Sequence, residues 1–485
     1  MRFWIYVLFG LIYLFILFLG KFYGSETIFL IKSLYLTLYL ITEIIEARME
    51  DRKNWMLNPA VLASVMTFIL GYGITNLIFF IPDSISRNDA FLNLGDDPLN
   101  LLNIAMDSVI FGAVSMWVGY RSNLGIFLFR MMTTSLVNIK KYFKNTFTVN
   151  INLIYSFVAI SILVRFYAII IGVYGYAQSP EEISEAAGIS QYIYLLGLLA
   201  QYSLLVISLV YFSAEEQNKF KKFLIALIII EVFFGLISGM KSLVVMPFII
   251  PLVAFFVLKR KIKKYYLGLA VIAIVVAYII IEPFRILRNM DPNFKSTPKY
   301  ILQTLYDAYI LNKQIGLIQE TDTEFFLFAF LSRNNYIMDA AKAIDYKDRV
   351  GLKEDDPDFS NRLLSIPMQA VIPRFIWSDK PLENIGLWFT QKVYGKEYYS
   401  STAMSPFGFL YFAGGNFLII IFFFIFGIMQ NALFRFIALG SGGIIIFLGL
   451  LSSVVLIDSS VNTIFVTWFR FYPMFIILQY ITFKK

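Results

Sequence analysis

Long apolar stretches, separated by short polar segments, run through most of the chain. Each stretch is long enough for a helix to cross a hydrocarbon layer of about 30 Å. A hydrophobic content of 59% and a mean hydropathy of +0.70 agree, because a soluble domain could not bury so large an apolar share. We therefore expect an all-α polytopic membrane protein with about twelve spans, at residues 3–20, 27–45, 59–82, 101–120, 151–176, 191–212, 223–239, 243–258, 267–283, 408–428, 443–458 and 462–482.

Basic clusters set the expected orientation of these spans. The segments "ARMEDRKN", "KKYFK", "NKFKK" and "KRKIKK" and the final two lysines all fall on one side when the spans alternate. Because Lys and Arg concentrate in cytoplasmic loops, that side is predicted to be cytoplasmic. Both termini would then be cytoplasmic, which an even number of spans also requires.

Three parts of the chain follow from this topology. Residues 1–283 form a nine-helix part with short loops, residues 284–407 a long extracytoplasmic loop, and residues 408–485 three C-terminal helices. A structureless loop of this length would be unusual, and "TPKYILQTLYDAYILNKQIGLIQ" and "NNYIMDAAKAID" have helical spacing. We expect these two helices in the loop, and an interfacial helix within residues 125–150.

The chain contains no cysteine and no histidine. This excludes disulfides, thiol nucleophiles, imidazole bases and Cys/His metal sites. Any acid–base chemistry must come from Asp, Glu, Lys, Tyr or the substrate. No nucleic-acid partner is expected.

Charged residues inside the predicted spans are the first candidates for function. Arg165, Glu231 and Arg470 lie well inside apolar runs, and Asp107 and Asp458 lie nearer the ends. An unpaired charge at such depth costs a few kcal/mol or more, so each should face a partner or a wet cavity. Arg165 and Glu231 could form a structural ion pair or line a substrate path.

Four further cationic residues flank the membrane on the predicted extracytoplasmic side. Lys241, in "GLISGMKSLVV", follows a tight reversal between two spans. It could bind an anion together with the exposed helix amides, or its side chain could extend to the aqueous interface without binding a ligand. Arg285 and Arg288 are three residues apart and could hold a phosphate or contact lipid headgroups. Arg333 follows an apolar run that could draw it to the membrane surface.

The segment "AVIPRFIWSDKP" in the long loop combines two prolines with an aromatic turn and two cations. Trp377 suits the bilayer interface, which would bring Arg374 and Lys380 to the headgroup plane. A fixed Arg at that depth suits a lipid-linked diphosphate, whereas the alternative is a membrane anchor with incidental charges.

The adjacent acids in "LGDDPLN" offer a rival metal site or the start of the next helix. Helix initiation is the favoured interpretation, and no metal site is predicted.

The order of several motifs resembles one known family. The segments are "SGMKS", "VIPRFIWSDKP", "GLWFTQKVYG" and "SSTAMSPFGFLYFAGGNF", the last leading into the tenth span. Together with a large late extracytoplasmic loop, they resemble the Wzy-type oligosaccharide repeat-unit polymerases of O-antigen and capsule synthesis over about residues 235–430. Two positions depart from the family pattern: Lys241 replaces an Arg, and Gly408-Phe409-Leu410-Tyr411 lacks the usual Glu.

The resemblance implies a GT-C-type helical bundle like that of the O-antigen ligases, in the bacterial cytoplasmic membrane with its site facing outward. The substrate would be an oligosaccharide on undecaprenyl diphosphate. A hydroxyl of one repeat unit would displace the lipid diphosphate of another with inversion, without any cofactor. Partners would be membrane lipid and, by analogy, a flippase and a chain-length regulator.

The resemblance also ranks the candidate residues. Fixed cations would stabilise the departing diphosphate, and carboxylates would serve as bases. Catalytic candidates are Arg374, Lys241, Arg333, Asp379 and Glu383; further diphosphate-binding candidates are Arg285, Arg288, Arg165 and Lys380; sugar-binding candidates are Trp377, Trp388 and Tyr394. The alternatives are an O-antigen ligase, which the absence of histidine disfavours, and a flippase for lipid-linked oligosaccharide, which the large loop disfavours.

Overall fold

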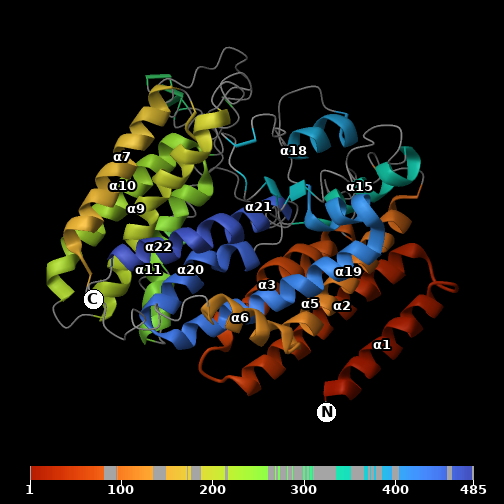
Figure 1. The fold of residues 1–485 in the computed structure, drawn as a ribbon. Coiled ribbons are helices and arrows are strands. Elements are labelled where there is room, and N and C mark those ends of the chain that lie inside the picture. Colours follow the sequence, from red (N-terminus) through yellow and green to blue (C-terminus); the bar gives the residue numbers. More distant parts are fainter. Residues whose placement is uncertain are drawn as a thin grey trace. The chain divides into compact units, whose positions relative to one another are not determined.

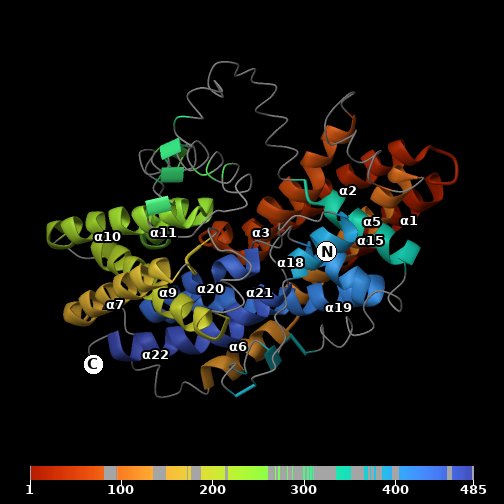
Figure 2. The same cartoon turned by 90° about the horizontal axis from the view of Figure 1, so that it is seen from above.

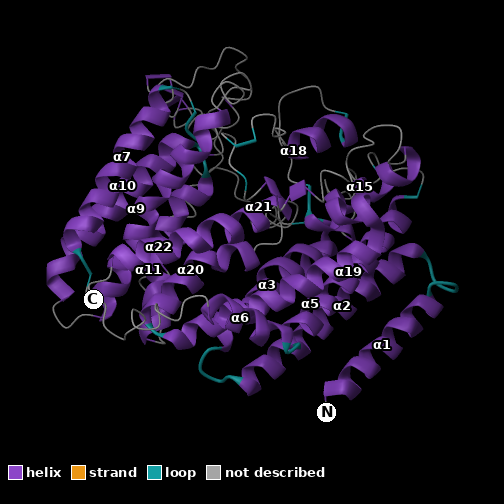
Figure 3. Ribbon diagram, viewed as in Figure 1, coloured by secondary structure: helices purple, strands orange, loops and turns teal. Residues whose placement is uncertain are grey.

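The computed structural model is helical wherever it is described, with no β-strand among those residues (Figure 3). It describes residues 2–80, 94, 97–134, 149–171, 173–175, 187–213, 217–259, 335–350, 385–395, 404–455 and 461–482, with short pieces between 268 and 310 and between 365 and 377. The chain forms two compact units. Unit 1 is Met1–Lys140 with Asp322–Phe475, and unit 2 is Lys141–Thr321 with Ile476–Lys485.

Unit 1 is built around the contact between two long helices, α5 and α19 (Figure 1). Helix α5 also packs against α2 and against α15, a helix of the long loop. The elements of unit 1 are α1 (Arg2–Leu19), α2 (Ser25–Glu50), η1 (Trp55–Leu57), α3 (Pro59–Ala63), η2 (Ser64–Gly73), η3 (Ile74–Phe80), α5 (Pro98–Arg121), α6 (Leu124–Thr134), α15 (Ile337–Val350), α18 (Ile385–Trp388), η5 (Phe389–Val393), α19 (Pro406–Arg435), η6 (Phe436–Leu439), α20 (Ser441–Val455), α21 (Val461–Val466), η7 (Thr467–Phe471) and the start of α22 (Tyr472–Thr482).

Three helices of unit 1 begin in the same way, with a polar cap followed by proline. The side chain of Asn58 accepts from the Ala60 amide at 3.0 Å, that of Asp97 from Asn100 at 3.2 Å, and that of Ser405 from Gly408 at 3.2 Å. Each cap satisfies an amide that the helix cannot, and proline at the first helical position needs no such partner. The sequence thus fixes where α3, α5 and α19 start.

Glycines allow α5 and α19 to approach closely. A Cβ built at Gly119 would lie 2.0 Å from the Phe424 carbonyl oxygen, and one at Gly427 would lie 1.9 Å from the Met116 carbonyl oxygen. Small residues at helix contacts are typical of membrane bundles, where packing, not hydrophobicity, drives association.

Ion pairs join the C-terminal ends of α2 and α5. Arg121 of α5 lies 2.6 Å from Glu46 of α2 and also pairs with Glu43.

We expect Gly427→Val to weaken the α5–α19 contact, because its side chain would collide with backbone that cannot rotate away. The predicted loss is about 1–3 kcal/mol in the free energy of unfolding. Thermal unfolding of the purified protein in detergent measures it. Gly10→Val is the matched control, since a Cβ at Gly10 meets nothing within 4 Å; an equal fall in both variants would contradict this packing.

Unit 2 is a smaller group of helices. It contains α7 (Ile151–Ile170), α9 (Ala187–Ser213), α10 (Gln217–Ser238) and α11 (Lys241–Lys259), together with the end of α22. Helix α9 packs against the other three, and α10 lies beside α11 (Figure 2). The Asn150 amide donates to the Thr482 carbonyl at 2.9 Å, which joins the end of α22 to the start of α7.

These helices confirm an all-α polytopic membrane protein. Eight described helices are long and apolar enough to span a membrane: Ser25–Glu50, Pro59–Phe80, Pro98–Arg121, Ile151–Ile170, Tyr192–Ser213, Lys241–Leu258, Pro406–Leu439 and Ile464–Thr482. The predicted spans at 3–20 and 443–458 correspond to shorter apolar helices, Trp4–Leu19 and Gly442–Val455. The span at 223–239 lies in α10, and that at 267–283 lies largely outside the described residues. The count of twelve stays a prediction.

Parts of the loop predictions can also be compared. Helix α15 confirms the helix expected from "NNYIMDAAKAID". Helix α6 covers the start of the expected interfacial helix, and the remainder, like most of the helix expected at 297–319, lies outside the described residues. The three-part division at 283 and 407 concerns topology across the membrane and stays a prediction.

Candidate functional site

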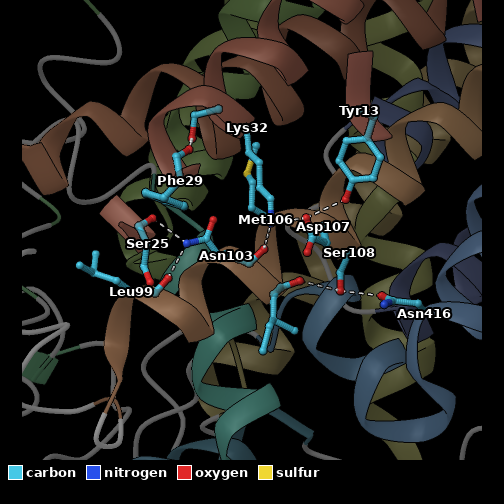
Figure 4. Close-up of polar contacts among 12 residues, drawn as sticks. Tyr13, Ser25, Phe29, Lys32, Leu99, Asn103, Met106, Asp107, Ser108 and Asn416 are labelled. Carbon is cyan, nitrogen blue, oxygen red and sulfur yellow. Dashed lines mark hydrogen bonds and ion pairs between the residues drawn. The ribbon is translucent and has the colours of Figure 1, made fainter. Parts of the chain in front are cut away.

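An ion pair between a buried lysine and a partly exposed aspartate lies at the centre of a polar network in unit 1. Lys32 of α2 and Asp107 of α5 are 2.5 Å apart, from Nζ to Oδ1, and the Tyr13 hydroxyl donates to the same oxygen at 2.7 Å (Figure 4). The Lys32 side chain is only 5% exposed. Because an isolated charge among apolar helices is costly, the pairing explains how both charges persist there.

The network lies near the first turns of two helices. Lys32 Nζ also donates to the backbone carbonyl of Asn103 at 3.3 Å. The side-chain Nδ2 of Asn103 donates to the backbone carbonyl of Ser25 at 2.7 Å (Figure 4). Ser25 is the first residue of α2. At 1.5 Å per residue, Lys32 is therefore roughly 10 Å along the helix from that end. This is the end that the charge pattern predicts to be extracytoplasmic.

Ser108, the residue after Asp107 in α5, makes a separate polar contact with α19. Ser108 donates from Oγ to Asn416 Oδ1 at 2.7 Å (Figure 4). Asn416 directly follows a break in α19, where Gly414 and Gly415 leave the helical conformation. Gly415 has φ +65° and ψ −161°, a region that only glycine adopts readily. Unit 1 thus contains an interrupted helix beside its polar network.

The residues just before α15 are hydrogen-bonded to the same bundle. The side-chain Nδ2 of Asn335 donates to Asn76 Oδ1 at 3.0 Å, and Asn76 Nδ2 donates to Ser33 Oγ at 3.0 Å. Asn335 lies two residues before α15, and Ser33 follows Lys32 in α2. The hydrogen bonds therefore connect the start of the loop helix to the helix that carries the buried lysine.

Two of the predicted sugar-binding residues lie beside α15. The Tyr394 hydroxyl donates to the Asp339 carboxylate, and Lys342 Nζ lies 3.9 Å from the centre of the Tyr394 ring. The Trp388 ring lies 6.1 Å from the Tyr346 ring, centre to centre. The structure thus groups Trp388 and Tyr394 with the side chains of one helix, while Trp377 is half-buried in its own short piece of the loop.

In unit 2, Arg165 and Glu231 form an ion pair, which was one of the two alternatives for these residues. Arg165 Nη1 bonds Glu231 Oε1 at 2.5 Å, and Nη2 bonds Oε2 at 3.1 Å. Nη2 also donates to the Gly197 carbonyl at 2.7 Å. This two-pronged geometry joins α7, α10 and α9, and both side chains are buried.

We expect Arg165→Met to destabilise the protein by about 3 kcal/mol, because it leaves the Glu231 carboxylate buried without its cation. The double variant Arg165→Met/Glu231→Met should recover most of that loss, since both charges are gone. Thermal unfolding of the three proteins in detergent tests this. A double variant as unstable as the single one would mean that the pair does not act as a unit.

The reversal predicted before Lys241 is also confirmed. Helix α10 ends at Ser238 and α11 begins at Lys241, with Gly239 between them at φ +66°. A Cβ at Gly239 would lie 2.5 Å from the Phe284 ring, so a side chain could not occupy this turn. Lys241 is half-buried, and its Nζ is shielded from solvent.

The remaining candidates divide into two groups. Arg470 is described in unit 1 and donates from Nη2 to the Gln369 carbonyl at 3.2 Å. Seven predicted site residues and one further charge lie outside the described residues: Arg374, Arg333, Asp379, Glu383, Arg285, Arg288, Lys380 and Asp458. Their roles stay predictions.

The acidic pair of "LGDDPLN" starts a helix in part as expected, because Asp97 caps α5. Asp96 lies outside the described residues. Within the described part of the chain, no group of three or more acidic side chains could hold a metal ion.

Sequence reasoning missed three charged residues of these clusters: Lys32, Asp339 and Lys342. Lys32 was detectable as a cation within a predicted span, where an ionisable residue usually has a function. Asp339 and Lys342 are three apart on the loop helix, a spacing that puts two side chains on one face.

No protein-family model matches the chain, and neither the curated proteins nor the solved structures contain a match.

Proposed function

We propose that the protein is a glycosyltransferase that polymerises oligosaccharide repeat units linked to undecaprenyl diphosphate, at the outer face of the cytoplasmic membrane. The observation that carries the proposal is the Lys32–Asp107 ion pair together with, one residue further along α5, the Ser108–Asn416 hydrogen bond beside the break in α19. Both contacts lie in an apolar bundle against which a helix of the long loop packs. Such a site offers hydrogen bonds to a polar sugar while apolar helices hold its lipid.

The reaction is a displacement at the anomeric carbon of the lipid-linked chain. A hydroxyl oxygen of the incoming unit forms the new bond to that carbon, and the bond from the carbon to the diphosphate oxygen breaks. The lipid diphosphate leaves with the bonding electrons, and a carboxylate takes the hydroxyl proton. Asp379 and Glu383 are the candidates for that base, and the diphosphate as leaving group removes the need for a nucleotide.

Lys241 supports the part of the proposal that concerns the leaving group. It is the first residue of α11, where the helix dipole is positive and the first amides have no partner within the helix. The positive end of the helix dipole repels the Lys241 ammonium group. An anion bound beside both would relieve that repulsion and accept hydrogen bonds from amides at the start of the helix. Lys241 would stabilise charge on the departing diphosphate, and the family resemblance suggests the same role for Arg374.

The finer topology belongs to the same proposal. Twelve spans, a GT-C-type bundle and cytoplasmic termini would put Lys32, Asp107 and Asn416 close to the outer surface. The starts of α2, α5 and α19 would all face outward, together with the loop that carries Arg374.

A flippase for lipid-linked oligosaccharide is the second candidate. Two observations favour it: the buried pair of Arg165 and Glu231, and the interrupted helix α19. Charges within spans and broken helices are both common in transporters.

The two functions differ in where repeat units accumulate when the protein is missing. We expect a deletion strain to carry single repeat units on the outer face, without long chains, and the wild-type gene to restore long chains. Mass spectrometry of lipid-linked and surface glycan, with an impermeant oxidant to mark outward-facing sugar, measures this. Repeat units confined to the cytoplasmic face would instead indicate a flippase.

A further inference from the structure

We infer that Asp107 and Asn416 bind hydroxyl groups of a sugar ring, beside the break in α19. This subsite deepens the proposed function and rests on it for the identity of the glycan. Neither residue was among the sugar-binding candidates from the sequence, which all lie in the long loop.

Asp107 has one oxygen occupied and one available. Its Oδ1 receives both the Lys32 ammonium group, at 2.5 Å, and the Tyr13 hydroxyl, at 2.7 Å. Its Oδ2 accepts no hydrogen bond from any described residue, and 22% of the side chain is exposed. A carboxylate can accept about four hydrogen bonds, so Oδ2 is held in a fixed orientation with its capacity unused.

Asn416 is arranged in the complementary way. Its Oδ1 accepts from Ser108, whereas its Nδ2 donates to no described residue (Figure 4). The side chain is half-buried, Gly414 is exposed, and nothing lies within 4 Å of a Cβ built at Gly415. The break in α19 therefore leaves space next to an amide with two donor hydrogens.

This combination fits sugar hydroxyls better than it fits ions. A hydroxyl group both donates and accepts, so one sugar hydroxyl can donate to Asp107 while another accepts from Asn416. The charge of Asp107 is balanced by Lys32, so the pair has no net charge to attract an anion. Among the described residues of this cluster Asp107 is the one carboxylate, which is too few for a divalent cation.

Binding of oligosaccharides tests the inference. The probes are fragments that mild acid releases from the organism's own surface polysaccharide, titrated against the full-length protein in lipid nanodiscs with saturation-transfer NMR. We expect Asn416→Ala to weaken binding at least tenfold and Asp107→Asn by a similar factor. Ser108→Ala is the matched control for Asn416, because it removes the same hydrogen bond but keeps the amide. This control should bind within about threefold of wild type.

Two results would overturn the inference: no binding by the wild-type protein, or equal losses in Ser108→Ala and Asn416→Ala. The proposed function is judged separately, by chain length in the deletion strain. If the wild-type protein does not bind the fragments but its deletion removes long chains, the polymerase function is supported and this subsite is rejected. Specific binding in a protein whose deletion leaves chain length unchanged would keep the subsite and reject the polymerase.

Discussion

Reversing the charge of Lys241 should lower polymer formation by at least about 100-fold, the usual effect of removing a group that stabilises developing charge. In Lys241→Glu, a carboxylate would face the diphosphate at the start of α11 and repel it. Lys241→Arg keeps the charge and should retain much of the activity. Chain length in a complemented deletion strain, measured on a polyacrylamide gel of surface glycan, reads out the effect.

Lys259→Glu is the matched control for Lys241→Glu, because it reverses a charge at the opposite end of the same helix. We expect long chains from this control at equal membrane levels. Long chains from Lys241→Glu itself would remove Lys241 from the site and leave it as an interfacial lysine.

Replacing Lys32 with methionine should lower both the stability of the protein and its ability to form polymer. Asp107 would remain among apolar helices without its cation, which costs about 3–5 kcal/mol in the free energy of unfolding. The same change would release the carboxylate from its fixed orientation and abolish polymer formation. Thermal unfolding in detergent and glycan analysis in the deletion strain measure the two effects.

A double variant separates stability from function here. Lys32→Met/Asp107→Leu removes both charges and should regain most of the stability while remaining unable to polymerise. Normal polymer from the double variant would show that the pair only holds α2 against α5. A double variant that stays as unstable as Lys32→Met would show that the two charges are not energetically coupled.

The helical architecture was largely predictable from the pattern of apolar residues. Spans of membrane length and caps such as Asp97 before Pro98 are local features, so they can be recognised without knowing the fold. The turn at Gly239 was predictable for the same reason. The break at Gly414 and Gly415 was not, because a glycine pair within an apolar run is equally compatible with a continuous helix.

The candidate site was predictable only in part. The partnership of Arg165 and Glu231 was anticipated as one of two alternatives, because each lies deep in a span and needs an opposite charge. Lys32 was overlooked because a lysine near the end of a span can also reach for water. Its pairing with Asp107 depends on how two separate helices pack, and that information is not contained in either segment alone.

Reconstitution with a defined substrate shows whether the protein alone joins lipid-linked repeat units. The purified protein is placed in liposomes with lipid-linked repeat units isolated from the deletion strain, without nucleotide or any other protein. We expect a ladder of longer glycans and release of one undecaprenyl diphosphate for each unit added, both lost in Lys241→Glu. Repeat units that cross the bilayer but stay single would contradict the polymerase function and identify a flippase.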